Sequence, residues 1–476
     1  MRKLHFTSAL ACLLLGCVAQ AGPVPSYGVP RIEVTPKRAF IDQPVKILLR
    51  DFPARCLVTV QLVTTNLAGQ AMQSHAEFLT DRRGNASLAT QAPKSGSYRL
   101  ADPAGLFWSL SIAGSNTAAL KKGLAPRGYV LTASVGDRTV ATATLERFIL
   151  SPGVRKINVR DHGLRGSLFL PAGKGPWPGI IVLGGSDGGV IEAPAAYLAA
   201  KGYAAFALAY FDYEDLPMSL ENIPLEYFQT AIHWLQARDD IKPNSVAVMG
   251  ASRGGELALL LGATFPDVHA VVAISASCVL WGGLSTNAGA WPQPAWIYHG
   301  KPLPFMPEIK LTDDQQRELW QLSRTNSAAV DLAWLSFQLE NKAAVAKATI
   351  PVEKINGSVL LISGDDDKLW PSTEMENLAM KRLDEARHPF PDRHLAYRGA
   401  GHMIPFAYTP TTVNMIIHPV TKERIVLGGD PEDTAAAAAD VWPRVIDFLN
   451  QSLKRDRHSL KKIKGGNMPA KSDRDF

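Results

Sequence analysis

Five stretches in the second half of the chain are almost continuously apolar and four to six residues long. Runs of this length without alternation are typical of strands that are buried on both faces, as in a parallel sheet. Helical stretches lie between them, including residues 193–201, 225–237 and 256–264. Alternating strands and helices predict a doubly wound, mostly parallel sheet that binds its ligand at the carboxyl ends of the strands. The five stretches are Gly179–Leu183, Ala204–Ala209, Val246–Met249, Ala270–Ile274 and Val359–Ile362.

The first part of the chain has a different pattern. Short β-like runs are separated by turn residues such as Gly136-Asp137, and no helical period of useful length is present. This spacing predicts an immunoglobulin-like all-β sandwich over residues 30–152, with a boundary near Ser151-Pro152-Gly153. The second domain then covers residues 153–453 and begins with a hairpin, Lys156–Leu170. The strand candidates of the sandwich are Val45–Leu49, Leu57–Val63, Tyr129–Val135 and Thr139–Leu145.

The end of the chain predicts one more helix and a basic tail. A helix is expected after Asp440, and residues 454–476 are expected to be disordered and solvated. This tail holds eight Lys/Arg against three Asp, and the leader adds Arg2 and Lys3 to the net charge of +6. The rest of the chain is therefore close to neutral, which argues against nucleic acid as a partner. The apolar face of the helix consists of Val441, Trp442, Val445, Ile446 and Leu449.

Residues 1–21 have the pattern of a secretory signal peptide, with a basic start, an apolar core and small residues at Ala19-Gln20-Ala21. We expect cleavage after Ala21 and a periplasmic or secreted protein. A competing interpretation is a lipobox at Leu14-Leu15-Gly16-Cys17, which would anchor the protein by a lipid on Cys17. No later run reaches the roughly 18 apolar residues of a transmembrane helix. Of the four cysteines, Cys56 and Cys278 follow the leader, and we expect both to be free thiols.

The clearest chemical motif is Gly250-Ala251-Ser252-Arg253-Gly254, placed between an apolar strand and a helical run. This is a Gly-x-Ser-x-Gly nucleophile elbow in its strand-turn-helix setting. The glycines are needed where a Cβ atom would collide with neighbouring backbone, and the serine stands at a helix N-terminus that favours a developing anion. The alternative is a glycine-rich loop with an incidental serine.

A serine hydroxyl is a weak nucleophile at neutral pH, so the motif requires a base and an acid that orients it. In the chain order of α/β-hydrolases these follow as Asp and then His. Of three consecutive carboxylates after a strand, Asp367 is our choice of acid, while Asp365 and Asp366 are expected to cap the loop. His402 lies on the glycine-rich loop Arg398–Pro405 and is the expected base. The other histidines considered, which lack such a setting, are expected to be structural or at the surface: His233, His299 and His394.

Two backbone donors should form an oxyanion hole beside the serine. One is the amide of Arg253, and the other is the amide of Gly185 or Ser186 in the turn after the first long strand. That glycine-rich turn has neither the Gly-Lys-Ser/Thr nor the Gly-x-Gly-x-x-Gly register of a phosphate-binding loop. We predict no cofactor and no metal ion for this chemistry.

Residues 281–350 contain an aromatic- and proline-rich stretch followed by a helical part, 313–345. Inserted between two strands of the sheet, this segment is expected to cover the site as a cap and to supply apolar walls for a substrate. The alternative is an insertion that packs against the body without contacting ligand.

Six segments of the chain together have a recognisable pattern: Asp102–Trp108, Arg147–Val154, Ala207–Pro217, Leu225–Phe228, Gly250–Glu256 and Gly364–Ser372. In these segments the chain resembles the acyl-CoA thioesterase and bile acid-CoA:amino acid N-acyltransferase family. The resemblance extends over about Arg31 to Leu453 and implies a β-sandwich joined to an α/β-hydrolase domain, with a triad at Ser252, Asp367 and His402.

The residue at position 252 separates the two activities of the family that the chain resembles. Its aminoacyl-transferring members use cysteine and its thioesterases use serine, so Ser252 implies a serine thioesterase that hydrolyses acyl thioesters of the acyl-CoA type. The leader favours an alternative, an exported carboxylesterase or peptidase with the same triad. A non-catalytic lipid-binding protein and an amino acid N-acyltransferase are further alternatives.

Overall fold

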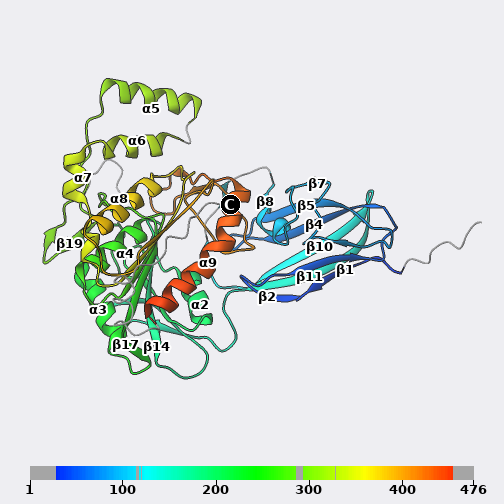
Figure 1. Cartoon of the computed structure of the whole chain (residues 1–476), viewed down its shortest axis with the longest axis horizontal. Coiled ribbons are helices and arrows are strands. Elements are labelled where there is room, and N and C mark those ends of the chain that lie inside the picture. Colours follow the sequence, from blue (N-terminus) through cyan, green and yellow to red (C-terminus); the bar gives the residue numbers. More distant parts are fainter. Residues whose placement is uncertain (1–27, 114–116, 119–120, 286–292, 327–328, 454–476) are drawn as a thin grey trace, which may run out of the picture.

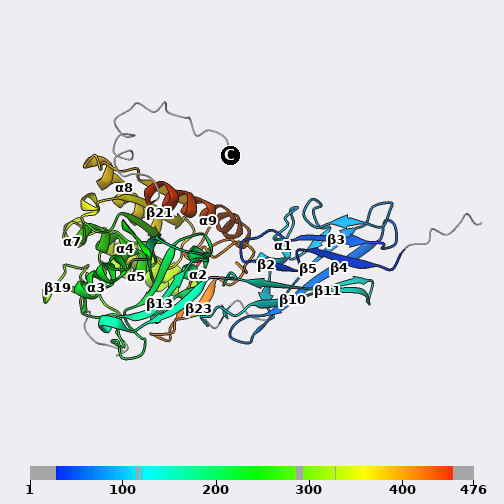
Figure 2. The same cartoon turned by 90° about the horizontal axis from the view of Figure 1, so that it is seen from below.

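The chain forms two parts that lie side by side along the long axis of the molecule (Figure 1). The structure, a computed structural model, describes residues 28–113, 117–118, 121–285, 293–326 and 329–453. The expected leader with Cys17 and the basic tail lie outside these residues. Figure 2, the view from below, shows the β-rich N-terminal part next to the larger α/β part.

The N-terminal part consists of two sheets. The smaller has the strand order β1-β3-β6 and the larger the order β2-β11-β10-β4-β5-β7, with β8 paired to β5. This part also contains a short helix, α1 (Gly105–Trp108). The strands are β1 (Arg31–Thr35), β2 (Arg38–Phe40), β3 (Lys46–Arg50), β4 (Leu57–Thr65), β5 (Ala71–Leu79), β6 (Ala86–Ser87), β7 (Ser95–Gly96), β8 (Ser111–Ile112), β10 (Arg127–Val135) and β11 (Arg138–Phe148).

The alternation predicted for these strands is present in the structure. In β4, Val58, Val60 and Leu62 are fully buried, whereas the residues between them are partly exposed. Since successive side chains of a strand point to opposite faces, one face of β4 enters the core between the two sheets. Ser151-Pro152-Gly153 lie between β11 and the first strand of the second part.

The second part is built on one eight-stranded sheet of order β12-β13-β15-β14-β17-β18-β21-β22. The strands from β15 to β22 in this order are parallel, and the hairpin β12–β13 adds an antiparallel edge. This is the predicted doubly wound, mostly parallel sheet. Its strands are β12 (Arg155–Val159), β13 (Arg165–Leu170), β14 (Trp177–Leu183), β15 (Ala204–Ala209), β17 (Ile241–Ala251), β18 (Ala270–Ile274), β21 (Ser358–Gly364) and β22 (Arg393–Tyr397).

Helices cover both faces of this sheet, which explains why its strands lack an alternating pattern. Ile181 of β14 packs into a core with α3, α4 and α8, whereas its neighbours Ile180 and Val182 pack into a second core with α2 and α9. Both faces of the strand are thus apolar. The helices are α2 (Glu192–Ala200), α3 (Leu225–Gln236), α4 (Arg253–Thr264), α8 (Ser372–Glu385) and α9 (Pro431–Leu453).

In the residues that the structure describes, the helical part of the inserted segment is divided into three helices. They are α5 (Asp313–Thr325), α6 (Val330–Leu339) and α7 (Lys342–Ala348), and Figure 1 shows α5 and α6 standing out from the body. Two small sheets complete the fold, β16-β19-β20 and β24-β23-β9. Their strands are β9 (Thr117–Ala118), β16 (Ile223–Pro224), β19 (Trp296–Tyr298), β20 (Lys301–Pro302), β23 (Met415–Ile417) and β24 (Arg424–Val426).

The last helix begins ten residues earlier than predicted, at Pro431 rather than at Val441, the residue after Asp440. Asp430 caps it, because its Oδ1 accepts hydrogen bonds from the amides of Glu432 (2.8 Å) and Asp433 (3.1 Å). The alanine-rich first turns have high helix propensity but no apolar periodicity, so the amphipathic pattern identifies only the later turns. No helix in the described ranges has the length and apolar character needed to cross a bilayer.

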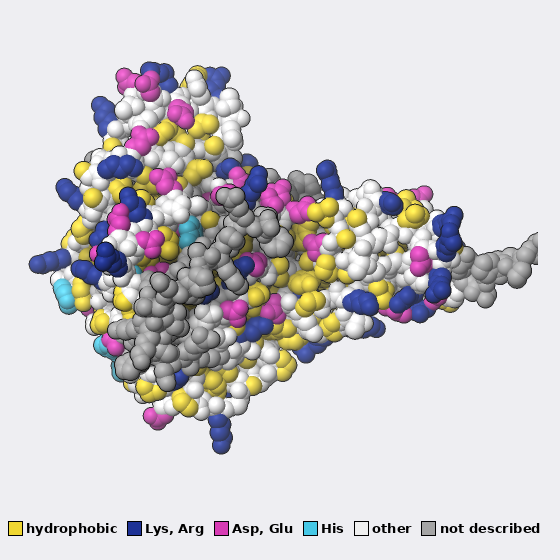
Figure 3. Space-filling view, in the orientation of Figure 1, with side chains coloured by type: hydrophobic (Ala, Val, Ile, Leu, Met, Phe, Trp, Pro, Cys, Tyr) yellow, Lys and Arg dark blue, Asp and Glu magenta, His cyan; other side chains and the backbone are white. Residues whose placement is uncertain are grey.

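The two parts are joined by a buried arginine at the end of β11. The Nη2 atom of Arg147 donates to the carbonyls of Phe40, Ile41 (2.6 Å) and Gln43 (3.0 Å), and its guanidinium lies 4.5 Å from the ring centre of Tyr408 in the second part. This cation–π contact helps to hold the two parts together, as does the ion pair of Asp42 with Lys201 at 2.6 Å. On the face seen in Figure 3, basic and acidic side chains are interspersed over both parts.

Candidate active site

Ser252 lies in the sharp turn between β17 and α4, with φ 57° and ψ −125°. This conformation is strained for a residue with a side chain, and it directs the hydroxyl away from the sheet. A Cβ atom on Gly250 would lie 2.1 Å from the Gly254 carbonyl oxygen, and one on Gly254 would lie 2.3 Å from that of Gly184. Both glycines are therefore required for the reason predicted. The Ser252 amide donates to the carbonyl of Ile274, at 2.8 Å.

Asp367 and His402 form a buried pair, with 2.8 Å between Oδ2 and Nδ1. The amides of Leu369 (2.9 Å) and Trp370 (3.1 Å) donate to Oδ1 of Asp367, and the Ser372 hydroxyl donates to Oδ2 at 2.7 Å. Four donors around one carboxylate suit its ionised, acceptor-only form. Because that carboxylate accepts from Nδ1–H, the neutral imidazole keeps Nε2 free to accept a proton.

The two neighbouring carboxylates have the structural roles expected of them. Asp365 Oδ1 accepts from the Gly399 amide at 2.6 Å, and Asp366 Oδ2 accepts from the Gly429 amide at 3.0 Å. Both contacts hold the loops on either side of His402 in place. Asp367 is thus the member of the three that contacts the histidine.

The elbow and the histidine loop meet at the carboxyl end of β18. Ile274 accepts from the Ser252 amide, and the next residue, Ser275, donates its hydroxyl to the His402 carbonyl at 2.7 Å. The Trp370 ring packs edge-on against His402, with 5.9 Å between ring centres, and its Nε1 donates to the Ser275 carbonyl. Among the described residues, no hydrogen bond joins Ser252 Oγ to His402. Such contacts are often loose in enzymes without substrate and tighten when it binds.

The loop after β14 passes beside the elbow. A Cβ atom on Gly185 would lie 3.5 Å from Ser252 Cβ, and Ser186 lines the same pocket as Ser252. The ion pair of Lys122 with Asp187, at 2.9 Å, holds this loop from the side of the N-terminal part. The three residues predicted for an oxyanion hole, Arg253, Gly185 and Ser186, are therefore grouped around Ser252.

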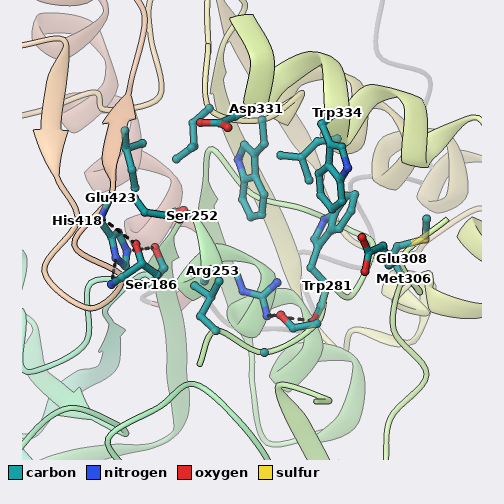
Figure 4. Close-up of a pocket in the computed structure, with 18 of the residues that line it drawn as sticks. Ser186, Ser252, Arg253, Trp281, Met306, Glu308, Asp331, Trp334, His418 and Glu423 are labelled. Atoms are coloured by element: carbon teal, nitrogen blue, oxygen red, sulfur yellow. Dashed lines mark hydrogen bonds between the residues drawn. The ribbon is translucent and has the colours of Figure 1, made fainter. Parts of the chain in front are cut away.

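Ser252 opens into a cavity of about 570 Å³ between the hydrolase body and the cap, within the size range of small-molecule sites (Figure 4). Much of its wall is apolar and comes from the insertion at residues 281–350, so the cap does contact this space. Burial and the nearby Glu423 carboxylate raise the pKa of Asp331. Glu308 is a third carboxylate of the wall. The apolar wall includes Trp281, Leu284, Leu319, Trp334, Leu335 and Trp370.

A buried ion pair connects the elbow to the base of the cap. Arg253 Nη1 lies 2.9 Å from Glu256 Oε2, and its Nη2 donates to the carbonyls of Trp281 and Gly282, both at 3.1 Å. Trp296 Nε1 donates to Glu256 Oε1 at 2.8 Å. Burial raises the pKa of Glu256 to about 7, although the Arg253 guanidinium acts in the opposite direction. The residue after the serine thus also fixes the cap, which the sequence did not indicate.

The other three histidines have the structural or surface positions predicted for them. His394 is largely buried, and its Nε2 lies 2.9 Å from Glu376 Oε2 and 2.8 Å from Ser363 Oγ. His233 and His299 lie at the surface. None of the three lines the pocket.

His418 is a site residue that the sequence did not reveal. It lines the pocket and lies 3.0 Å from the Ser186 hydroxyl, across 232 residues of sequence. The only local signal is the turn that Pro419 predicts between two short strands. In the described residues, no group of three or more His, Cys, Asp or Glu side chains is arranged to hold a metal ion.

A serine on a nucleophile elbow, at the carboxyl end of a mostly parallel sheet and under a cap, defines the class of α/β-hydrolases. Two family models match the chain: "Acyl-CoA thioester hydrolase/BAAT N-terminal region" over residues 42–161, and "BAAT / Acyl-CoA thioester hydrolase C terminal" over residues 223–455. The chain belongs to this family of acyl-CoA thioester hydrolases and BAAT proteins, and is by class a thioester hydrolase.

Individual relatives are similar along most of their length. Human acyl-coenzyme A thioesterase 1 is 32% identical over 87% of this chain and 94% of its own. Human mitochondrial acyl-coenzyme A thioesterase 2 is 32% identical, over 87% of this chain and 82% of its own. Mouse acyl-coenzyme A amino acid N-acyltransferase 1 is 31% identical over 89% of this chain and 98% of its own. Overall identity therefore does not separate hydrolases from acyltransferases.

The choice of Asp367 among three consecutive carboxylates can be tested with a matched pair of variants. Asp367→Asn removes the acceptor for His402 Nδ1–H, so we expect kcat for ester or thioester hydrolysis to fall by about 10⁴-fold. Asp366→Asn, one residue away, should change kcat by less than about fivefold, because its carboxylate contacts a loop amide rather than His402. Steady-state kinetics of both purified variants measure this. Equal losses in the two would show that Asp367 is not the acid that orients the base.

Proposed function

We propose that this protein is a serine thioesterase that releases free acid and thiol from acyl thioesters through an acyl-Ser252 intermediate. The observation that carries the proposal is the position of Ser252, on a strained elbow that opens into a largely apolar pocket. The buried pair of Asp367 and His402, anchored at the same strand end, supports a catalytic triad.

Each group has one role in the proposed reaction. His402 Nε2 accepts the Ser252 proton as the hydroxyl attacks the carbonyl carbon, while Asp367 holds Nδ1–H and stabilises the imidazolium. The amides of Arg253 and of Gly185 or Ser186 donate to the oxyanion. His402 then protonates the leaving thiolate and afterwards activates the water that hydrolyses the acyl-serine.

The pocket and the relatives support a fatty acyl group as the part of the substrate that the cap binds. The wall offers three tryptophans and several leucines, which suit a hydrocarbon chain of medium or long length. The human relatives are named acyl-coenzyme A thioesterases. By this argument the enzyme acts in the metabolism of fatty acids or other lipids.

Ser252 supports hydrolysis rather than transfer to an amino acid. In the family that the sequence resembles, the acyltransferases carry cysteine at the nucleophile and the thioesterases carry serine. An amine must react with the acyl-enzyme faster than water does, and a thioester intermediate favours the amine more than an oxyester does. The free acid is therefore the expected product.

The charges of the pocket support the proposal that the charged part of the leaving group stays outside it. Glu308, Asp331 and Glu423 line it, and the guanidinium of Arg253 is already paired with Glu256. The phosphates of CoA would be repelled by these carboxylates, so the pantetheine arm enters and the nucleotide stays outside. This argument also gives some support to esters with neutral leaving groups.

The expected signal peptide leads to a second proposal, that the mature protein works outside the cytoplasm. Cleavage after Ala21 would leave Gly22 as the first residue and release a periplasmic or secreted enzyme. Lipidation at Cys17 is the alternative.

The thioesterase proposal is tested by Ser252→Ala. This variant should lose at least about 10⁴-fold in kcat on a long-chain acyl thioester, since no nucleophile remains. The wild-type protein should also be labelled by a fluorophosphonate at Ser252, as mapped by mass spectrometry, and should yield free acid in the presence of glycine or taurine. An unlabelled protein would instead indicate a binding function, and an N-acyl amino acid product would indicate a transferase.

The proposal that the CoA nucleotide stays outside the pocket is tested with two thioesters of the same acyl chain. We expect kcat/KM for the N-acetylcysteamine thioester to lie within about tenfold of that for the CoA thioester, because the nucleotide contributes little binding energy. Asp331→Asn should lower KM for the CoA thioester while KM for the neutral one stays the same. A preference of more than about 100-fold for CoA would contradict this, since it requires a site for the phosphates.

The location is tested by the intact mass of the protein exported from a secretion-competent bacterial host. We expect a soluble periplasmic or extracellular species that begins at Gly22. A species that begins at Cys17 and carries a lipid would support the anchored alternative, and a full-length cytoplasmic protein would contradict both.

A further inference from the structure

Ser186, in the loop after β14, presents a side-chain hydroxyl as well as a backbone amide to the pocket. The residue is half-buried and lines the cavity together with Ser252. Its Oγ lies 3.0 Å from Nε2 of His418, a contact drawn in Figure 4. No other hydrogen-bond partner of this hydroxyl occurs among the described residues.

The hydrogen positions in this contact follow from the partner of the other ring nitrogen. The Thr421 amide donates to His418 Nδ1 at 3.1 Å. A backbone N–H can only donate, so Nδ1 is unprotonated and the neutral imidazole carries its hydrogen on Nε2. His418 therefore donates to Ser186 Oγ, and the hydrogen of the Ser186 hydroxyl is directed elsewhere.

His418 is built to remain in this neutral form. Only 3% of the residue is exposed, and burial lowers the pKa of its imidazole. The His418 amide donates to the Glu423 carbonyl at 2.8 Å, and the His418 carbonyl accepts from the Lys422 amide at 2.9 Å. These two hydrogen bonds fix the turn between β23 and β24. Protonation of Nδ1 would place two donors against each other, which further disfavours the charged form.

The loop that carries Ser186 is held on both sides. Tyr210 donates its hydroxyl to the Gly184 carbonyl at 2.7 Å, and Lys122 pairs with Asp187 at 2.9 Å. Gly185 lies against Ser252. A polar group on a loop fixed in this way does not have to reorganise during a reaction, which is the condition for effective electrostatic stabilisation.

We propose that the side-chain hydroxyl of Ser186, oriented by His418, donates an additional hydrogen bond to the oxyanion that forms on attack by Ser252. In that step a bond forms between Ser252 Oγ and the carbonyl carbon, the π electrons move to the carbonyl oxygen, and the Ser252 proton passes to His402. Ser186 forms and breaks no covalent bond. Ser186 is thus a catalytic residue through its side chain, and His418 is a positioning residue. This inference rests on the proposed function of the site.

Ser186→Ala tests the inference because it removes the hydroxyl and keeps the backbone amide. We expect kcat to fall by about 100-fold with KM nearly unchanged, the size of effect known for loss of one oxyanion donor. A trifluoromethyl ketone that carries the acyl chain forms a hemiketal oxyanion with Ser252, so its affinity should fall by a similar factor. The affinity of the matching thioether analogue, which has no carbonyl group and forms no oxyanion, should stay the same. Unchanged kcat and ketone affinity would overturn the proposal.

Two variants of His418 provide a matched comparison that does not depend on the folding of Ser186→Ala. Both His418→Gln and His418→Ala leave the Thr421 amide without the imidazole acceptor, but glutamine keeps a nitrogen donor at about the reach of Nε2. His418→Gln should retain most of kcat, whereas His418→Ala should lose about tenfold or more. Equal losses in the two would show that His418 acts only through packing.

The double variant Ser186→Ala/His418→Ala separates this inference from the proposed function. If His418 acts through Ser186, the double variant should be no slower than Ser186→Ala alone. Additive losses would overturn the assigned relation between the two residues. Failure of the proposed function would be seen separately, as a wild-type protein without thioesterase activity or fluorophosphonate labelling at Ser252.

Discussion

The left-handed backbone of Ser252 is the constraint on which the arrangement of the site depends. A residue with φ 57° is stable only if the surrounding backbone holds it, and here the Ile274 carbonyl and two close-packed glycine neighbours do so. The turn ends β17 and starts α4 within one residue, so the hydroxyl stands at the edge of the sheet. Every other group of the site is placed relative to that edge.

Parallel strands bring distant segments to this edge, and hydrogen bonds then set their distances. Asp367 follows β21, and His402 lies on the loop after β22. Ser275 at the end of β18 connects the two loops, since its hydroxyl donates to His402 and its carbonyl accepts from Trp370. The base is thus anchored one residue away from the contact that holds the elbow. These hydrogen bonds explain how Ser252 and His402, which are 150 residues apart in the sequence, are held close together.

The sequence predicted the parts of the site that follow local rules. The turn at Ser252 and the contact of Asp367 with His402 could be predicted because each residue occupies a fixed place relative to a strand end, and the doubly wound sheet followed from uniform apolar runs. The start of α9 was missed because alanine turns carry no periodicity, and His418 because its contact with Ser186 depends on tertiary packing. The pair of Arg253 and Glu256 was missed for a similar reason, as a charged pair on a helix is usually solvated. Its burial depends on Trp296 and the carbonyls of the cap, which no local pattern specifies.

The N-terminal part contributes to the site through the segment between β8 and β10. Strand β9 pairs with β23, the strand that leads directly into His418, and Lys122 pairs with Asp187 in the loop beside the elbow. Both segments come from the N-terminal part, and Arg147 holds that part against Tyr408 at the junction. The loop of Gly185 and Ser186 is therefore fixed between contacts from two domains. Ser252, by contrast, is anchored within the α/β sheet by the Ile274 carbonyl. The position of the Gly185–Ser186 loop thus depends on contacts from both parts of the chain, whereas the position of Ser252 depends on the α/β sheet.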